Sequence, residues 1–266
     1  MQDKVVVITG ATGGMGRALS WHFGRAGAKL GLLDVQREAL ENFAHELQHE
    51  AIRVHTCVCD VTHEQACHAA MQSVSSHFGR IDILINNAGI TQRSAFSHTQ
   101  SEVFQRVMNV NFFGALYCTQ AALPALVESR GTIIVMSSIA GFSPLFGRSG
   151  YSASKHALHG LFESLRTEMR EAGVHVMMVC PGFTATGIEK NALGADGRPA
   201  TQPRSTTGKI AQPEEVATAI YRAAQKRKRM LVLSRVGKLA YWISRFAPAL
   251  YERLMHKRLR HELPAT

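Results

Sequence analysis

Short runs of valine, isoleucine and leucine recur along the chain and alternate with segments long enough to form helices. The runs begin at residues 5, 29, 52, 81, 132 and 174, and a shorter run begins at residue 230. Their apolar residues are consecutive rather than alternating, which is typical of strands buried on both faces. The pattern predicts an α/β fold, a doubly wound parallel sheet of about seven strands with helices on both faces.

Between these runs, apolar residues recur every three or four positions, as at 15–26 and 151–171, and predict amphipathic helices. The pattern fails at 187–213, where Gly, Pro, Ser, Thr and Asn dominate. Because a long irregular segment in a compact domain is often an active-site lid, we expect a mobile substrate lid there. A chain of 266 residues, 45% of them apolar, is long enough for one domain, which we place at 1–234, followed by an extension at 235–266.

The net charge of +10 is concentrated in and just before this extension. Between positions 226 and 262 there are eleven Lys and Arg residues but only two acidic residues. The spacing of apolar residues there predicts two amphipathic helices, with Pro248 in the first turn of the second. Their apolar stripes consist of Leu239, Trp242, Ile243 and Phe246 in the first helix, and Leu250, Leu254 and Leu259 in the second.

Two interpretations of the basic extension remain open. Either its apolar faces pack on the domain or on a second subunit near the active site, or residues 235–262 attach to an anionic membrane surface. Nucleic-acid binding is not expected, because no recognition motif accompanies the charge. The first strand begins close to Met1, which leaves no room for an export signal, and no stretch approaches the roughly 20 apolar residues of a spanning helix. We therefore expect a cytoplasmic protein, peripheral at a membrane under the second interpretation.

The first apolar run leads directly into a glycine-rich turn, Thr9-Gly10-Ala11-Thr12-Gly13-Gly14-Met15-Gly16, and then into a helical pattern. Glycines let the backbone turn tightly and approach a pyrophosphate, and a helix N-terminus offers free N–H donors and a favourable dipole. The turn therefore predicts a dinucleotide site, although its Gly-x-x-x-Gly-x-Gly spacing differs from the commoner Gly-x-Gly-x-x-Gly fingerprint. The alternative is a tight strand-to-helix turn without a ligand.

Asp34 ends the second run, where a carboxylate can accept hydrogen bonds from an adenosine ribose. A 2′-phosphate at this place would meet a like charge, so NAD(H) is favoured over NADP(H). Arg37 is close enough in sequence to keep NADP(H) open. The alternative role of Asp34 is that of a capping residue.

Tyr151 and Lys155 are four residues apart, which places them on one face of a helix. A tyrosine is a poor base at neutral pH, and a neighbouring cation lowers its pKa by favouring the phenolate. The pair is therefore a candidate for acid–base catalysis. Because this spacing arises by chance in many helices, its significance depends on the other motifs.

Together, the motifs resemble those of the classical short-chain dehydrogenase/reductase family. The resemblance runs from about Lys4 to Leu233 and rests on the glycine turn, Asn86-Asn87-Ala88-Gly89, Asn111, Ser138, Tyr151 with Lys155, and Pro181-Gly182. It implies a Rossmann-type oxidoreductase that moves a hydride between a nicotinamide cofactor and an alcohol or ketone carbon, without a metal.

The resemblance also implies roles for individual residues. Tyr151 would be the general acid/base, Lys155 would hold the nicotinamide ribose and lower the tyrosine pKa, and Ser138 would orient the substrate oxygen. Asn111 would support a water-linked proton relay. The cofactor would be bound by Gly10, Thr12, Gly14, Met15, Gly16, Asp34, Asp60, Val61, Asn87, Ala88, Gly89, Tyr151, Lys155, Pro181, Gly182 and Thr186. For Asp60, expected to contact adenine with Val61, a strand-ending cap is the alternative.

The expected partner is a small alcohol or ketone, and an apolar one if the extension lies on a membrane. A steroid, a retinoid or a fatty carbonyl would suit the apolar residues in segments that border the family's pocket, Phe142, Leu145, Phe146 and Phe183. The resemblance implies a homodimer or homotetramer. The alternative function is a non-catalytic dinucleotide sensor or scaffold on the same fold, whose signature would be loss of the catalytic side chains.

Overall fold

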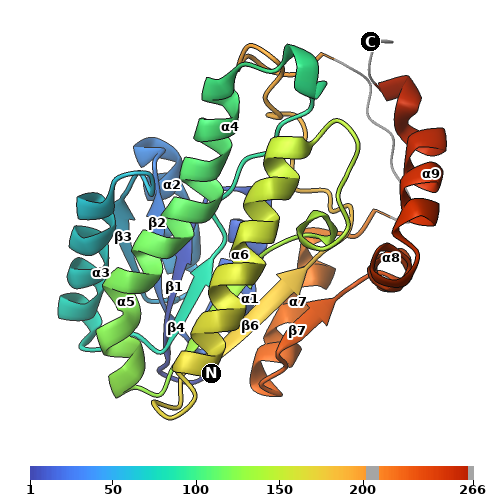
Figure 1. The fold of residues 1–266 in the computed structure, drawn as a ribbon. Helices are drawn as coiled ribbons and strands as arrows, with labels where there is room; N and C mark the ends of the chain where they lie inside the picture. Colours follow the sequence, from blue (N-terminus) through green and yellow to red (C-terminus); the bar gives the residue numbers. More distant parts are fainter. Residues whose placement is uncertain (202–209, 263–266) are drawn as a thin grey trace.

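Seven parallel strands form one sheet in the order β3-β2-β1-β4-β5-β6-β7 in the computed structural model, which describes residues 1–201 and 210–262 (Figure 1). Each predicted apolar run contains one strand. The strands are β1 Val5–Thr9, β2 Lys29–Asp34, β3 Val54–Val58, β4 Ile83–Asn86, β5 Thr132–Met136, β6 His175–Cys180 and β7 Met230–Val232. The doubly wound fold class is thereby confirmed.

Helices connect the strands and cover the sheet. They are α1 Gly14–Arg25, α2 Arg37–His49, α3 Glu64–Phe78, α4 Ser101–Met108, α5 Gly114–Glu128, α6 Ser149–Glu168, α7 Pro213–Gln225, α8 Arg235–Phe246 and α9 Pro248–Leu259. Short helical turns are η1 Phe96–His98, η2 Asn109–Phe113, η3 Ile139–Gly141 and η4 Arg260–Glu262.

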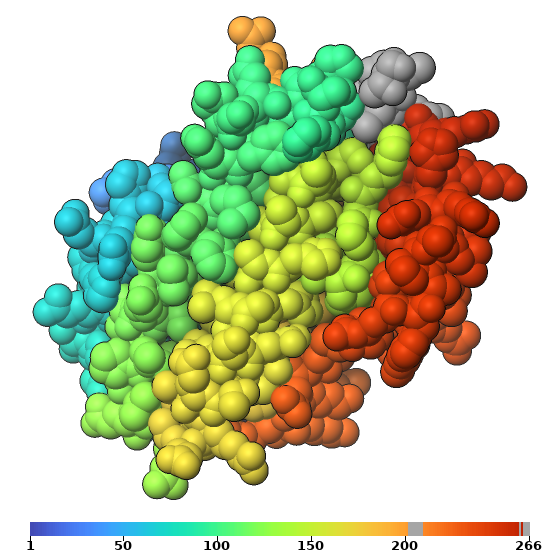
Figure 2. Space-filling view, in the orientation of Figure 1, coloured from blue at the N-terminus to red at the C-terminus, as the bar shows by residue number. Residues whose placement is uncertain are grey.

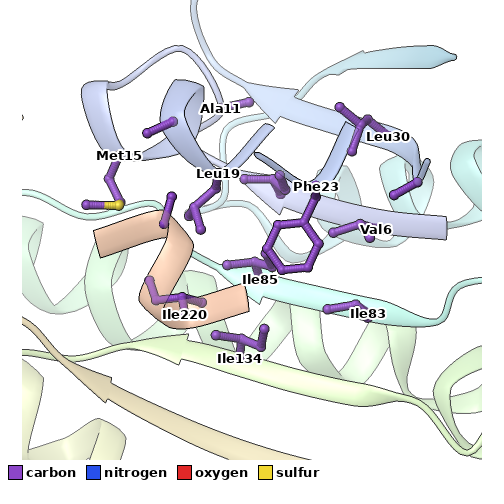
Figure 3. Packing of buried hydrophobic residues seen from close by; sticks show 14 of the residues in the cluster. Val6, Ala11, Met15, Leu19, Phe23, Leu30, Ile83, Ile85, Ile134 and Ile220 are labelled. Carbon is purple, nitrogen blue, oxygen red and sulfur yellow. The ribbon is translucent and has the colours of Figure 1, made fainter. Parts of the chain in front are cut away.

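Successive side chains of each strand point to opposite faces of the sheet, so both faces are buried. In β1, Val6 and Ile8 belong to a core shared with α1, α2 and α7, whereas Val5 and Val7 belong to one shared with α3, α5 and α6. Figure 3 shows the first of these cores, with Leu19 and other α1 residues close to the sheet. Burial on both faces explains why the strands read as continuous apolar runs.

The order of connections reverses between β1 and β4, and this switch point is held by hydrogen bonds. The Thr9 hydroxyl accepts the backbone N–H groups of Asn87 and Ala88, each at 3.0 Å. The Asn87 amide in turn donates to the carbonyls of Thr9 and Gly10 at 2.9 and 3.0 Å. In sheets of this kind, ligands bind beyond the carboxyl ends of the strands at such a point.

One helical stretch, Ser101–Glu128, is long and apolar enough to cross a membrane by length and hydropathy alone. It comprises α4, the π-helical turn η2 and α5. In this structure α5 packs against α3 and the sheet, and α4 packs against α6. These contacts are those of a helix within the domain.

Helices α8 and α9 coincide with the two segments expected in the extension, and Pro248 lies in the first turn of α9. They form one flank of the molecule, coloured red in Figure 2. Six large apolar side chains of these helices are exposed, and we call them the tail surface: Val236, Leu239, Trp242, Phe246, Leu250 and Leu254. By contrast, Leu259 is buried. The extension thus packs on the domain and also leaves an apolar face uncovered.

The described part of the expected lid is irregular in structure but packed against the domain. Ala192 and Leu193 are buried, and Leu193 contacts Val103 and Val107 of α4. Positions 202–209 of the expected lid lie outside the described residues. Mobility of the segment stays a prediction.

Candidate active site

The glycine turn between β1 and α1 is shaped by backbone contacts that side chains would obstruct. Gly10 has a φ of +63°, a conformation that favours glycine. A Cβ atom on Gly14 would lie 2.8 Å from the carbonyl oxygen of Thr186. The backbone at the start of α1 is therefore not covered by side chains of its own, and it lies close to Thr186. This cradle, with free N–H groups at a helix start, fits the pyrophosphate of a dinucleotide.

Asp34 is tied to the glycine turn. One carboxylate oxygen accepts hydrogen bonds from the Thr12 backbone N–H at 2.9 Å and the Thr12 hydroxyl at 2.7 Å, and the other accepts the Gln36 N–H at 3.1 Å. The carboxylate thus stabilises the turn, as in its alternative role. An ionised carboxylate offers about four acceptor positions, so these three bonds leave room for a ribose hydroxyl.

Asn111 holds the loop after β4 in place. Asn111 lies in η2 and is buried, and its Oδ1 accepts the Ile90 N–H at 2.8 Å. Its amide donates to the Ile90 carbonyl and to the Ser154 hydroxyl, both at 2.9 Å. A Cβ atom on Gly89 would lie 3.2 Å from Asn111 Oδ1 and 3.6 Å from Lys155 Nζ, so this loop lies against α6.

Asp60 and Val61 lie in the turn between β3 and α3. Asp60 accepts the Thr62 backbone N–H at 2.9 Å and the Thr62 hydroxyl at 2.8 Å, and its side chain is about half exposed. Val61 is buried against Gly114 at the start of α5. Asp60 therefore stabilises the turn into α3, which is the capping role given above as the alternative. The exposed part of its side chain remains accessible to an adenine ring.

A cavity of about 1010 Å³ opens beyond the carboxyl ends of β5 and β6. Its wall includes Ser138, Tyr151 and Lys155, which come from the end of β5 and from α6. Lys155 is buried and donates a 2.8 Å hydrogen bond to the Met136 carbonyl. Its Nζ lies 5.6 Å from the centre of the Tyr151 ring. The three candidate catalytic side chains therefore meet at one place.

The expected depression of the Tyr151 pKa is wrong for this structure. Burial raises the pKa of Tyr151 to about 12, and the opposing effects of the Ser138 hydrogen bond and the Arg148 charge are smaller. Burial also lowers the pKa of Lys155 to about 8. Removing both groups from water disfavours their charged forms, and for the phenolate this cost exceeds the stabilisation by the Ser138 hydrogen bond and the Arg148 charge.

The cavity gathers half of the predicted residues. Besides the catalytic three, it is lined by Met15, Asn87, Gly89, Pro181, Gly182 and Thr186. The remaining predicted residues lie outside its lining, in the glycine turn and the start of α1, at the end of β2, after β3, in the loop after β4, or in η2: Gly10, Thr12, Gly14, Gly16, Asp34, Asp60, Val61, Ala88 and Asn111. The outer group follows the path expected of an extended dinucleotide across the sheet.

Sequence reasoning considered packing of the extension near the active site but missed its individual side chains as part of this cavity wall. Twelve residues of 235–262 line it, among them Ile243, Tyr251 and Glu262. It also missed Arg148, a buried cation that pairs with Glu262 at 3.0 Å. The sequence does not indicate that residues 114 positions apart form a pair. An arginine three residues before Tyr151 could, however, have been noted as a candidate site residue.

Comparison with known proteins agrees with this geometry. The family profile described as short chain dehydrogenase matches residues 4–196. The chain belongs to the short-chain dehydrogenase family. The Dehydrogenase/reductase SDR family member 7B of Bos taurus is 39% identical over 98% of this chain and 83% of its own, and that of Xenopus tropicalis is 37% identical over 98% and 87%.

Solved structures of family members have the same fold. A short-chain dehydrogenase from Streptomyces avermitilis matches with a TM-score of 0.81 and 27% identity, over 97% of this chain and 98% of its own. An alcohol dehydrogenase from Thermococcus sibiricus, complexed with 5-hydroxy-NADP, matches with a TM-score of 0.76 and 26% identity, over 87% and 96%. The protein is thus an oxidoreductase of this family with a nucleotide-binding Rossmann fold.

The lowered pKa of Lys155 makes stability depend on pH. Between about pH 8 and 10.5 the unfolded chain binds more protons at this site than the folded chain, so the free energy of unfolding should rise with pH. Relative to Lys155→Met, we expect the wild type to gain roughly 3 kcal/mol across this range, since one pKa unit corresponds to about 1.4 kcal/mol. Urea unfolding of both proteins at pH 7, 8.5 and 10 measures the gain.

The matched control is Lys190→Met, which removes an exposed lysine and should leave the pH dependence of the wild type unchanged. A constant difference in free energy of unfolding between wild type and Lys155→Met at all three pH values would contradict the burial effect.

Proposed function

We propose that the protein transfers a hydride between NAD(H) and a lipophilic alcohol or ketone whose oxygen lies between Ser138 and Tyr151. The observation that carries this proposal is the meeting of Ser138, Tyr151 and Lys155 on the wall of a cavity that also reaches Thr186 and Met15 beside the glycine turn. When bound, the nicotinamide nucleotide supplies the hydride donor or acceptor.

In this proposal the residues of the chain hold the substrate and move its proton. The Ser138 hydroxyl hydrogen-bonds the substrate oxygen, and the Tyr151 phenol gives a proton to that oxygen during ketone reduction or takes one during alcohol oxidation. Lys155, fixed by the Met136 carbonyl, places its ammonium group near the ribose and the phenol. Asn111 holds the Ile90 loop and α6 together, which leaves it in place for the proton relay.

An apolar substrate is supported by the composition of the cavity wall. Leu145 and Phe183 line it, as proposed from the sequence, and side chains of the extension such as Ile243 and Leu254 complete it. Phe142 and Phe146 instead pack on the extension, against Tyr241 and His256. An apolar wall of this size suits a fatty, retinoid or steroid carbonyl better than a small polar one.

We further infer that the tail surface rests on an anionic membrane. Trp242 and Phe246 are 57% and 75% exposed and stack on each other, and exposed cations flank them at Lys238 and Arg245. An exposed apolar stripe bordered by cations matches the interface of an anionic bilayer in both polarity and charge. Leu239 and Leu254 belong both to this surface and to the cavity wall, so the cavity borders the proposed membrane side.

This arrangement extends the proposal to localisation and assembly. The protein would be cytoplasmic and peripheral at a membrane, and an apolar substrate could pass from the lipid to the cavity without crossing water. A homodimer or homotetramer stays a prediction, in which the uncovered tail surface would lie outside the subunit contacts.

Replacing the phenol tests the proposed chemistry. We expect Tyr151→Phe to lower turnover at least a hundredfold, because it removes the proton that the reaction needs, while the affinity for NADH stays within about threefold. The assay follows NADH oxidation with methyl ketones from butanone to tetradecanone, retinal and a steroid ketone, beside fluorescence titration of NADH. Wild-type protein that binds NADH but reduces no carbonyl would favour a dinucleotide sensor instead.

The cofactor preference follows from the charge at the end of β2. We expect NADH to bind at least tenfold more tightly than NADPH, and Asp34→Asn to narrow this ratio, because the variant removes a charge that repels a 2′-phosphate. The variant retains an oxygen that can accept the Thr12 bonds. Equal or tighter binding of NADPH would contradict this preference and indicate that Arg37 binds the 2′-phosphate. Arg37 is exposed and paired with Glu41 at 3.5 Å, and in that case Arg37→Ala should weaken the binding of NADPH.

Vesicle flotation tests the tail surface. We expect the wild type to float with phosphatidylcholine vesicles that contain phosphatidylserine, and to be released as NaCl is raised, because salt screens the attraction. Replacing Trp242 and Phe246 by Asp should abolish flotation. The matched control, Phe96→Asp, changes an equally exposed phenylalanine outside the extension. Wild-type protein that stays with the aqueous fraction at low salt, or variants that float like it, would contradict membrane attachment.

A further inference from the structure

The two candidate catalytic hydroxyls, Ser138 and Tyr151, are connected by an irregular loop, residues 142–148. From within the domain, the loop is held by the Ser152 hydroxyl, which accepts the Leu145 N–H at 3.2 Å, and by the Ser94 N–H, which donates to the Gly147 carbonyl at 3.0 Å. The loop leads into the first turn of α6, on which Tyr151 lies. Its position therefore influences how Tyr151 faces Ser138.

The extension contacts the same loop at several points. The Ser244 hydroxyl donates to the Phe142 carbonyl at 3.2 Å and lies 2.9 Å from the Ser143 hydroxyl. The Tyr251 hydroxyl donates to the Pro144 carbonyl at 3.1 Å. Without these donors, the two carbonyls would depend on water or on other partners.

The strongest of these contacts is an ion pair between Arg148 and Glu262. Their side chains are 3% and 1% exposed, and Arg148 Nη1 lies 3.0 Å from the carboxylate. The same nitrogen donates to the Phe146 carbonyl at 3.2 Å, and the Arg148 carbonyl accepts the Ser152 N–H in the first turn of α6. Breaking a buried pair leaves an uncompensated charge, so the two residues hold each other in one geometry.

We propose that α8, α9 and Glu262 act as a positioning element for catalysis, which fixes loop 142–148 and thereby the placement of Tyr151 against Ser138. The inference rests on the proposed function, because it concerns the efficiency of that proton transfer. It assigns to the extension a role beyond covering the cavity or touching a membrane. Arg148, Ser244, Tyr251 and Glu262 are positioning residues in this scheme.

Two substitutions, one at each end of the contact, test the role. Glu262→Gln removes the charge of the pair, and Tyr251→Phe removes the donor to Pro144. For each we expect kcat with tetradecanone and NADH to fall about tenfold, while the KM for tetradecanone and the Kd for NADH stay within about twofold. Amide hydrogen exchange in residues 142–148 should become faster, because the loop loses a partner.

Two further variants separate positioning from general damage. Glu262→Asp keeps the charge and should restore most of kcat. Glu252→Gln makes the same change at an exposed glutamate of α9 and should leave kcat and hydrogen exchange as in the wild type. Thermal unfolding of all variants identifies any that fail to fold, and Tyr251→Phe supplies the second test if Glu262→Gln does.

The outcomes separate this inference from the proposed function. Wild-type protein that reduces no carbonyl of the panel overturns both. If the wild type is active and both variants keep its kcat, the positioning role is overturned whether or not hydrogen exchange changes. A rise in the KM for tetradecanone at unchanged kcat also overturns it, because the extension would then be a cavity wall only.

Discussion

The hydrogen bonds that join the ends of β1 and β4 hold together everything the protein presents to its ligands. Thr9 accepts two N–H groups of the loop after β4, and Asn87 returns two hydrogen bonds to β1 and the glycine turn. Most of these groups are main-chain and removed from water, so their hydrogen bonds have to be made within the protein, and these four bonds fix the two loops against each other. The glycine turn, the Asn111 region and the start of α6 are placed relative to this junction.

From the junction, the site extends in two directions that differ in character. Toward β2 and β3, polar groups shape tight turns, and Asp34 and Asp60 each bind the backbone and hydroxyl of a neighbouring threonine. Toward β5 and β6, the wall is apolar and contains the partly or fully buried Tyr151 and Lys155. A charged nucleotide and the apolar substrate that we propose require such different surroundings, and both kinds lie along a single sheet edge.

Much of this could be predicted from the sequence because the signals are local. Continuous apolar runs predicted the strands, because a strand buried on both faces shows no alternation of apolar and polar residues. The four-residue spacing of Tyr151 and Lys155 predicted that both lie on one face of a helix, which is α6. Effects that depend on distant partners could not be predicted. The pKa of Tyr151 depends on how deeply the cavity wall buries it, and the Arg148–Glu262 pair joins residues 114 positions apart. The helical spacing of the extension was visible, but which of its apolar residues face the cavity depends on how α8 and α9 dock.

The Arg148–Glu262 pair also sets an order of events during synthesis. Arg148 leaves the ribosome 114 residues before Glu262. At about 5–20 residues per second, on the order of ten seconds pass before its partner is made. Throughout that time the guanidinium group can stay hydrated, and the loop that carries it has its bonds to Ser94 and Ser152 but lacks its contact with Glu262. The sheet and its nucleotide cradle can form in this interval, whereas the substrate cavity is completed only when the last helix arrives.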